Sequence, residues 1–401
     1  MATGNSLARG VYVVAAKRTA FGAFGGTLKG HSPTDLQVHA AQAAMAAGGV
    51  KAENISSVCI GNVLSASSAD APYLARHVAL RCGLAVPTPA LIVNRLCGSG
   101  FQSVVNGVQE ILVGDSEIVL TGGTDNMSAC PYAVRDIRFG TKLGQDPKLE
   151  DMMWTSLTDM LAKTPMGVTA ENLAEKYNIT REECDNFALR SQQTWAAAAQ
   201  AGVFADEIAA LKIKTRKGEV VFDTDEHPKP KTTLEQLVKL PTVFKKNGVV
   251  TAASASGICD GAAAVIIASE EAVAKYNLTP LARIAGYGVA GCDPTIMGIG
   301  PVPAIGVMLE KAGLTLGQID QIEINEAFGA QTLACQKALD IPMEKLNTCG
   351  GAIALGHPLA ASGARISAHL VHKLRQNKQK YGIGSACIGG GQGISILFEA
   401  V

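Results

Sequence analysis

The stretch NRLCGSGFQSVVNGVQEIL, residues 94–112, has a counterpart in NTCGGAIALGHPLAASGARISAHLVHKL, residues 347–374. In each stretch a strand ends, a glycine-rich turn follows and a helix begins. Each helix leads to a strand that runs into glycines, SEIVLTGG at 116–123 and YGIGSACIGGG at 381–391. Upstream, ISSVCIGN at 55–62 resembles IDQIEIN at 319–325. This internal similarity predicts a duplicated unit with pseudo-twofold architecture, in which corresponding turns meet at one site.

Short β-branched runs alternate with alanine-rich stretches along both halves. We expect buried strands at 11–16, 57–61, 117–121 and 263–268. The stretch 35–47 is expected to be a helix that ends at Gly48 and Gly49. This alternation predicts an α/β fold with helices on both faces of a sheet.

The segment from 125 to 246 is more polar and richer in turns than the rest. We predict that it is an inserted loop domain, because long excursions from a compact sheet are often functional. The chain then divides into an N-terminal half (residues 1–124 and 247–274), the inserted loop domain (125–246) and a C-terminal half (275–401).

Composition excludes several classes of function. Hydrophobic residues make up 47% of the 401 residues and charged residues 17%, and the net charge is 0. We therefore expect a large core, some surface buried between subunits, and no nucleic acid or anionic membrane as partner. No apolar run is long enough to span a bilayer.

Ten cysteines are present and none forms a CxxC pair. We expect free thiols in a reducing compartment and no metal site. Before Asp35 the chain has basic residues but no acidic one. This pattern is typical of an uncleaved mitochondrial signal, and an ordinary short tail is an equal alternative.

Cys97 is followed by Gly98 and Gly100, and apolar residues at helical spacing follow from Phe101. The thiol is therefore predicted at a helix amino terminus, where the dipole and free N–H groups lower the pKa of a thiol. The glycines would admit a substrate. An unreactive buried cysteine is the alternative.

His357 lies between Gly356 and Pro358, which fix the local backbone. Its turn corresponds to that of Cys97 in the duplicated unit, so we expect the two side chains to meet. A structural hydrogen-bonding role is the alternative. His369 and His372 on the following helix are expected on the solvated surface.

Cys387 ends a strand and is followed, after one residue, by Gly389, Gly390 and Gly391. Bare glycine amides can bind a developing oxyanion, although a tight turn would have the same sequence. Asn325 ends the strand at INEAF and could orient a water molecule. The alternative role of Asn325 is to cap a helix that begins near 327.

The motifs NRLCGSG, NEAF, GGAIALGHP and CIGGGQG occur in the order and spacing of the thiolase family. The resemblance covers essentially the whole chain and is closest to the mitochondrial type of 3-ketoacyl-CoA thiolase. It implies a duplicated five-layer αβαβα architecture with an inserted loop domain. The implied reaction is cleavage of a 3-ketoacyl-CoA by CoA to acetyl-CoA and a shortened acyl-CoA, in fatty acid β-oxidation.

The resemblance also implies a role for each site residue. Cys97 would be the nucleophile, His357 its base, and Cys387 the acid that protonates the enolate. His357 and a water held by Asn325 would form one oxyanion hole. The amides of Cys97 and Gly389 would form the second.

CoA is implied as co-substrate, with no permanently bound cofactor. By resemblance, Lys229 and Thr232 would contact its nucleotide end and Ser256 its pantetheine. Three positions depart from the family pattern: Lys229 replaces Arg, Ala360 replaces Gly in GHPLG, and Ser254 replaces Asn. Lysine lacks the planar fork of arginine, so the first departure predicts weaker CoA binding.

Three alternatives remain open. A short-chain acetoacetyl-CoA thiolase is one, although Pro165 stands where such enzymes often have His. A non-catalytic thiolase-like binding protein would lack one of Cys97, His357 and Cys387. A ketoacyl synthase would have His in place of Cys387. The resemblance further implies a homodimer or homotetramer in the mitochondrial matrix, with the cytosol as the other compartment.

Overall fold

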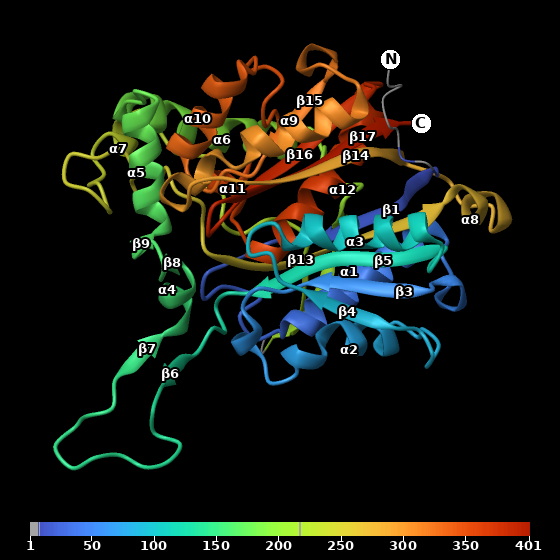
Figure 1. The fold of residues 1–401 in the computed structure, drawn as a ribbon, viewed down its shortest axis with the longest axis horizontal. Coiled ribbons are helices and arrows are strands. Elements are labelled where there is room, and N and C mark those ends of the chain that lie inside the picture. Colours follow the sequence, from blue (N-terminus) through green and yellow to red (C-terminus); the bar gives the residue numbers. More distant parts are fainter. Residues whose placement is uncertain (1–6, 8, 216–217) are drawn as a thin grey trace.

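The computed structural model describes residues 7, 9–215 and 218–401. Its centre is an eleven-stranded mixed sheet that crosses the molecule (Figure 1). In spatial order the main path is β15 (Gln321–Ile324), β16 (Tyr381–Ile388), β17 (Gln392–Ala400), β14 (Ala282–Gly291), β1 (Val11–Thr19), β13 (Cys259–Ser269), β5 (Ile118–Asn126), β3 (Ser57–Gly61) and β4 (Ala90–Val93). Two short strands lie off this path, β2 (Gly22–Ala23) beside β13 and β10 (Ile208–Ala209) beside β1. All four expected strands form.

The two ends of the sheet have the same pairing pattern, which confirms the predicted duplication. β3 runs parallel to β5, β5 antiparallel to β13, and β13 antiparallel to β1. In the same way β15 runs parallel to β16, β16 antiparallel to β17, and β17 antiparallel to β14. The two units join where β1 pairs with β14 through Tyr12–Arg283 and Val13–Ala282. The sheet is therefore continuous from one unit to the other.

Helices form three layers around the two units of the sheet, as the five-layer prediction requires. Between the units lie α3 (Ser99–Val113) and α12 (Leu359–Asn377), and α12 contacts β5 and β13 on one side and β16 on the other. Outside the first unit lie α1 (Pro33–Gly48) and α2 (Leu74–Arg81), and outside the second lie α9 (Pro301–Ala312) and α10 (Gly329–Leu339). A short helix, α8 (Glu270–Lys275), follows β13.

The helix expected at 35–47 is α1, and its ends follow from sequence. Ser32 and Asp35 form a reciprocal capping box, with hydrogen bonds of 3.0 and 3.2 Å. Gly49 ends the helix in the left-handed conformation, at φ 61°. Both signals are common at helix ends, because they satisfy backbone groups that have no partner within the helix.

α3 and α12 approach each other closely at glycines. A Cβ atom on Gly363 would lie 2.4 Å from the amide nitrogen of Phe101, so only glycine permits this separation. Both helices begin beside this contact. Cys97 is two residues before α3 and His357 is two residues before α12. The close approach therefore brings the two turns together, as the duplication predicts.

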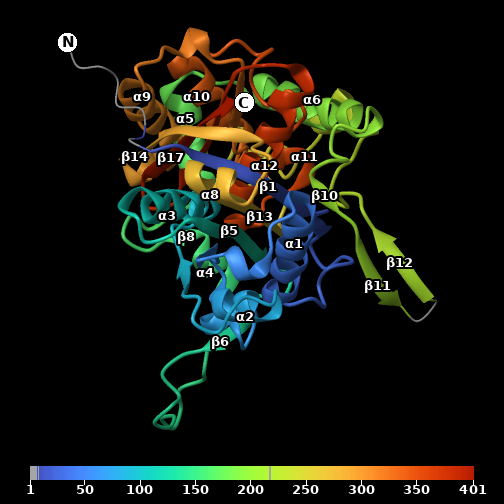
Figure 2. The same cartoon turned by 90° about the vertical axis from the view of Figure 1, so that its right-hand side faces the viewer.

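Between β5 and β13 the chain leaves the sheet. This excursion contains β6 (Tyr132–Val134), β7 (Leu149–Asp151), α4 (Met152–Ser156), β8 (Thr158–Asp159), β9 (Thr164–Pro165), α5 (Met166–Lys176), α6 (Arg181–Gln200), β11 (Leu211–Thr215), β12 (Gly218–Phe222) and α7 (Leu234–Leu237). The β6–β7 and β11–β12 hairpins project from the body as two arms (Figures 1 and 2). α5 and α6 pack on α10. The boundaries at 125 and 246 stay a prediction, and Asp125 and Asn126 belong to β5.

A buried ion cluster attaches the excursion to the core. Arg18 of β1 contacts Glu207 at 2.7 Å and Asp225 at 2.6 Å, and both carboxylates belong to the excursion. Glu207 also lies 2.8 Å from Nδ1 of His369 on α12. Because all four side chains are buried, the cluster joins three parts of the chain through fully desolvated contacts. Within the described ranges, no helix is long and apolar enough to cross a membrane.

Candidate active site

Cys97 lies on a strained turn between β4 and α3. Leu96, the residue before it, has a positive φ of 46°, which is uncommon outside glycine. Side-chain hydrogen bonds hold the turn: the amide of Leu96 donates to Asn94 Oδ1 at 2.9 Å, and the Ser99 hydroxyl donates to the Leu96 carbonyl at 2.6 Å. Strain that is supported in this way is typical of functional sites.

The surroundings of Cys97 are apolar, and the expectation of a lowered pKa at this thiol is wrong. Cys97 packs against Leu64, Met127 and Leu359. Burial raises the pKa of the Cys97 thiol to about 11, and the amide of Gly389, which donates to the sulfur, offsets only part of that rise. Loss of hydration therefore outweighs the helix amino terminus, and the resting group is a neutral thiol.

His357 occupies the turn between α11 (Ala352–Leu355) and α12, in a buried position. Nδ1 lies 2.5 Å from Ser362 Oγ, and Nε2 lies 3.4 Å from Nδ2 of Asn325. The backbone amide donates to the carbonyl of Gly257 at 2.9 Å. Burial, together with the cation of Arg365, lowers the pKa of His357 to about 3. The imidazole is therefore neutral at rest, and a neutral ring can accept a proton from a thiol.

Cys387 is the penultimate residue of β16 (Tyr381–Ile388) and is fully buried beside Met297 and Ala327. Burial raises the pKa of the Cys387 thiol well above its ordinary value, and the neighbouring Cys97 raises it further. The two thiols, 290 residues apart in the sequence, are thus electrostatic neighbours. A group that keeps its proton at neutral pH can later donate it.

The glycine turn after Cys387 packs directly on the Cys97 turn. A Cβ atom on Gly98 would lie 2.5 Å from Cδ1 of Ile388, so any larger residue there would have to displace the Ile388 side chain. Gly389 has its amide on the sulfur of Cys97. An N–H group beside a nucleophile is placed to bind an oxyanion that forms on an attacked carbonyl.

Asn325 does not cap a helix, so that alternative is wrong. The next helix, α10, begins at Gly329, and its cap position is Phe328. Oδ1 of Asn325 is buried and makes no hydrogen bond with the described residues. This oxygen is available to accept from a bound molecule beside His357.

The residues predicted to bind CoA lie on two adjacent loops. Ser256 precedes Gly257, whose carbonyl receives the His357 amide, so this loop borders the site. Lys229 is exposed, and the Thr232 hydroxyl donates to the Lys229 carbonyl at 2.8 Å. His227 Nδ1 lies 2.7 Å from the Ala354 carbonyl, which fixes the second loop against α11. Both loops therefore lead to the His357 turn.

His369 and His372 are not on the solvated surface, so this prediction is wrong. His369 is buried in the ion cluster, and His372 Nε2 lies 3.0 Å from the carbonyl of Ala16. No group of three or more metal-ligating side chains occurs among the described residues.

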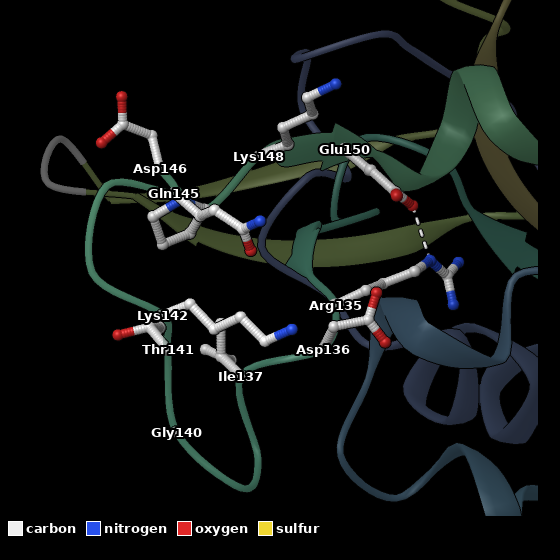
Figure 3. A pocket seen from close by; sticks show the side chains of 11 residues that line it. Arg135, Asp136, Ile137, Gly140, Thr141, Lys142, Gln145, Asp146, Lys148 and Glu150 are labelled. Atoms are coloured by element: carbon white, nitrogen blue, oxygen red, sulfur yellow. Dashed lines mark hydrogen bonds and ion pairs between the residues drawn. The ribbon is translucent and has the colours of Figure 1, made fainter.

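Two hollows lie outside this constellation. The one in Figure 3 has a volume of about 600 Å³ and lies within the β6–β7 arm, where Arg135 and Glu150 form an ion pair at 2.6 Å. The other, of about 400 Å³, is lined by Trp195, Phe204 and Asp225 among others. Neither is lined by a residue that the sequence motifs predicted for the site.

Two family models match the chain: the N-terminal domain of thiolase over residues 11–271 and the C-terminal domain over 278–400. The chain therefore belongs to the thiolase family, and the predicted resemblance is confirmed.

Within this family the chain is similar to mitochondrial 3-ketoacyl-CoA thiolases over its full length. The human mitochondrial enzyme is 62% identical across 98% of this chain and 99% of its own. The crystal structure of human mitochondrial 3-ketoacyl-CoA thiolase in complex with CoA matches with a TM-score of 0.97 at 61% identity, covering 100% of both chains. An acetyl-CoA acetyltransferase of Bacillus anthracis matches with a TM-score of 0.95 at 43% identity, over 99% of this chain and 100% of its own.

Proposed function

We propose that the protein is a 3-ketoacyl-CoA thiolase, an acyltransferase of fatty acid β-oxidation. It would cleave a 3-ketoacyl-CoA with CoA to give acetyl-CoA and a shortened acyl-CoA. The observation that carries the proposal is the meeting of the Cys97, Cys387 and His357 turns. A Cβ atom on Gly98 would lie 2.5 Å from Cδ1 of Ile388, and one on Gly100 would lie 2.4 Å from the carbonyl oxygen of Ala360. The higher identity to mitochondrial 3-ketoacyl-CoA thiolases than to the acetyltransferase supports this substrate class.

In the first half of the reaction, Nε2 of His357 takes the proton of the Cys97 thiol. The thiolate attacks the 3-keto carbon, and the C2–C3 bond breaks to leave acetyl-CoA as an enolate. Cys387 gives its proton to C2, and the acyl group remains on Cys97 as a thioester. Sulfur suits this role, because it is a good nucleophile and a good leaving group.

The enolate oxygen needs donors while the C–C bond breaks. The protonated Nε2 of His357 supplies one, and a water on Asn325 supplies the other. The close pair of His357 and Asn325, at 3.4 Å, supports this assignment. Removal of one such donor costs about 3–4 kcal/mol in comparable acyl-transfer sites.

In the second half, CoA enters and its thiol gives its proton to the Cys387 thiolate left by the first half, while His357 keeps the proton that it later returns to Cys97. Its sulfur attacks the thioester carbon, and the amides of Cys97 and Gly389 hold the oxyanion. The intermediate then expels the Cys97 thiolate, which recovers a proton. We assign Lys229 and Thr232 to the nucleotide end of CoA and Ser256 to its pantetheine. CoA is a co-substrate in this scheme, and no permanently bound cofactor takes part.

The alternative substrate is acetoacetyl-CoA, the short-chain member of the same class. A chain-length series of 3-ketoacyl-CoAs with CoA, followed by loss of the enolate absorbance, tests both. We expect turnover of medium or long chains at least as fast as that of acetoacetyl-CoA. Turnover of acetoacetyl-CoA alone would favour the alternative, and no turnover at any length would contradict the proposed function.

We also propose a homo-oligomer, either a dimer or a tetramer. The β6–β7 arm supports this, because Phe139 is 98% exposed and Leu143 and Leu149 are exposed with it. Large apolar side chains exposed together on one arm often mark a protein interface. A monomeric mass in light scattering would contradict the proposal. The named mitochondrial relatives support the matrix rather than the cytosol as the compartment, which fluorescence imaging of the tagged chain would test.

A further inference from the structure

Asp125 is fully buried at the end of β5, and its carboxylate is surrounded by hydrogen-bond donors. Oδ1 accepts from the amides of Val63 and Leu64, at 3.1 and 2.9 Å, and from Nδ2 of Asn62 at 3.1 Å. Oδ2 accepts from the amide of Ala360 at 2.7 Å. Burial raises the pKa of Asp125 to about 6, but four donors favour the charged carboxylate at neutral pH.

The two oxygens of this carboxylate hold two different segments that both contribute to the apolar surroundings of Cys97. Oδ1 holds the segment 62–64, and Leu64 packs in the same apolar cluster as Cys97. Oδ2 holds the first turn of α12, and Leu359 of that turn belongs to the same cluster. One side chain therefore bridges the two walls that enclose the thiol.

The start of α12 depends on this bridge, because the helix has no cap of its own. Its cap position is Pro358, which makes no side-chain hydrogen bond. Asp125 supplies the carboxylate that a neighbouring Ser or Asp usually provides, across a separation of 235 residues. His357 lies two residues before the first residue of α12, so its position follows that of the helix.

We propose that Asp125 is a positioning residue for acyl transfer, whose carboxylate fixes the His357 turn relative to Cys97. This inference rests on the proposed function. Asp125 does not touch the reacting atoms and acts through the amide of Ala360. Small displacements of a base from its nucleophile reduce turnover strongly. The hydrogen bonds of Asp125 go to residues 62–64 and 360 and not to the loops of Lys229 and Ser256, so CoA binding is unaffected.

The test is Asp125→Asn, with Asp260→Asn as matched control. The asparagine amide would face a backbone N–H with its own N–H, so one side of the bridge is lost. Asp260 is also fully buried, on the adjacent strand β13, and accepts from the amide and hydroxyl of Ser128 at 2.9 and 2.6 Å. We expect kcat of Asp125→Asn to fall about 10²-fold. Its KM for CoA should stay within about twofold of wild type, and Asp260→Asn should keep the wild-type kcat.

A second variant breaks the same contact from the helix side. Ala360→Pro lacks the N–H that donates to Oδ2, and proline is tolerated in a first helical turn. If circular dichroism shows that Asp125→Asn does not fold, Ala360→Pro becomes the test of the positioning role. We expect the same loss of kcat in this variant, with an unchanged KM for CoA.

Several outcomes would overturn the inference. They are a wild-type kcat in either folded variant, a change in KM for CoA instead of kcat, an equal loss in Asp260→Asn, or failure of both variants to fold. Absence of thiolysis in the wild-type protein would instead overturn the proposed function.

Discussion

Nδ1 of His357 lies 2.5 Å from the hydroxyl oxygen of Ser362, one turn into the helix that follows it. The other ring nitrogen faces the amide nitrogen of Asn325 at 3.4 Å. Because the Asn325 amide N–H can only donate, this pair is favourable when Nε2 carries a lone pair and the proton resides on Nδ1. Ser362 therefore accepts from Nδ1 and selects the tautomer in which Nε2 can take a proton from a thiol.

Ser362→Ala removes this acceptor, and we expect kcat to fall about 10- to 100-fold, because the base then loses its fixed tautomer and orientation. Steady-state thiolysis with KM for CoA measured in parallel is the readout. Ser367→Ala is the matched control, since Ser367 is also buried on α12 and donates only to the Gly363 carbonyl, at 2.8 Å. An unchanged kcat in Ser362→Ala would show that the hydrogen bond has no role in the reaction.

Cys97→Ala should abolish thiolysis, because no other side chain can carry the acyl group at that turn. The measurement is intact-mass spectrometry after incubation with an acyl-CoA. Wild-type protein should gain one acyl group and the variant none. Appreciable residual turnover would refute the role of Cys97 as nucleophile.

Cys387→Ser should slow protonation of the enolate much more than acylation of Cys97 by a simple thioester. A serine hydroxyl is a much weaker acid than a thiol, so the group keeps its size but loses its proton-donating power. Single-turnover measurements of the two steps separate them. Equal slowing of both steps would argue against Cys387 as the acid.

Lys229→Ala should mainly raise KM for CoA and leave kcat close to the wild-type value. Lys229 is exposed, whereas Cys387 is buried, so the charge of Lys229 is expected to act on the bound nucleotide and not on the chemical step. Screening of such an exposed contact by salt limits the expected change to about tenfold or less. An unchanged KM would remove Lys229 from the CoA site. Lys239→Ala, another exposed lysine outside the predicted CoA set, is the control.

The duplicated fold could be predicted from sequence because each unit repeats the same local signals in the same order. The sequence predicts the strand at 57–61 with the bounds that the structure gives it. The continuous sheet could not be predicted in this way. It depends on only two residue pairs between β1 and β14, which leave no pattern in the sequence.

The sequence singles out Cys97 and Cys387 because glycines flank both thiols, and the structure brings these two residues together. The sequence does not indicate Ser362 or Asp125, because the roles proposed for them depend on contacts that only the folded chain makes, one of them across 235 residues. The direction of the pKa shift at Cys97 was wrong for a related reason. A helix amino terminus can be recognised in sequence, whereas the apolar side chains that remove water from the thiol come from distant segments.

The sequence predicts His369 on the surface, but α12 lies between the two units of the sheet and is buried on both sides. A helix of this kind has no solvent-facing side, so the spacing of its polar residues does not show which of them are exposed. Burial by itself would lower the pKa of His369, but Glu207 outweighs it and raises that pKa to about 10. In the unfolded chain the pKa of a histidine is about 6.5. The ion pair therefore stabilises the fold fully below about pH 6.5, and this contribution is lost as the pH rises toward 10.

His369→Gln should consequently lower the melting temperature most at about pH 6, with a difference from wild type that shrinks steadily toward pH 10. Thermal unfolding at several pH values, with protein concentration held constant, measures this difference. His372→Gln is the control, because burial lowers the pKa of His372 and its contact with Ala16 does not weaken on the alkaline side. A difference for His369→Gln that stays constant from about pH 6 to 10 would mean that the buried imidazole is neutral, and that the cluster is held by Arg18 alone.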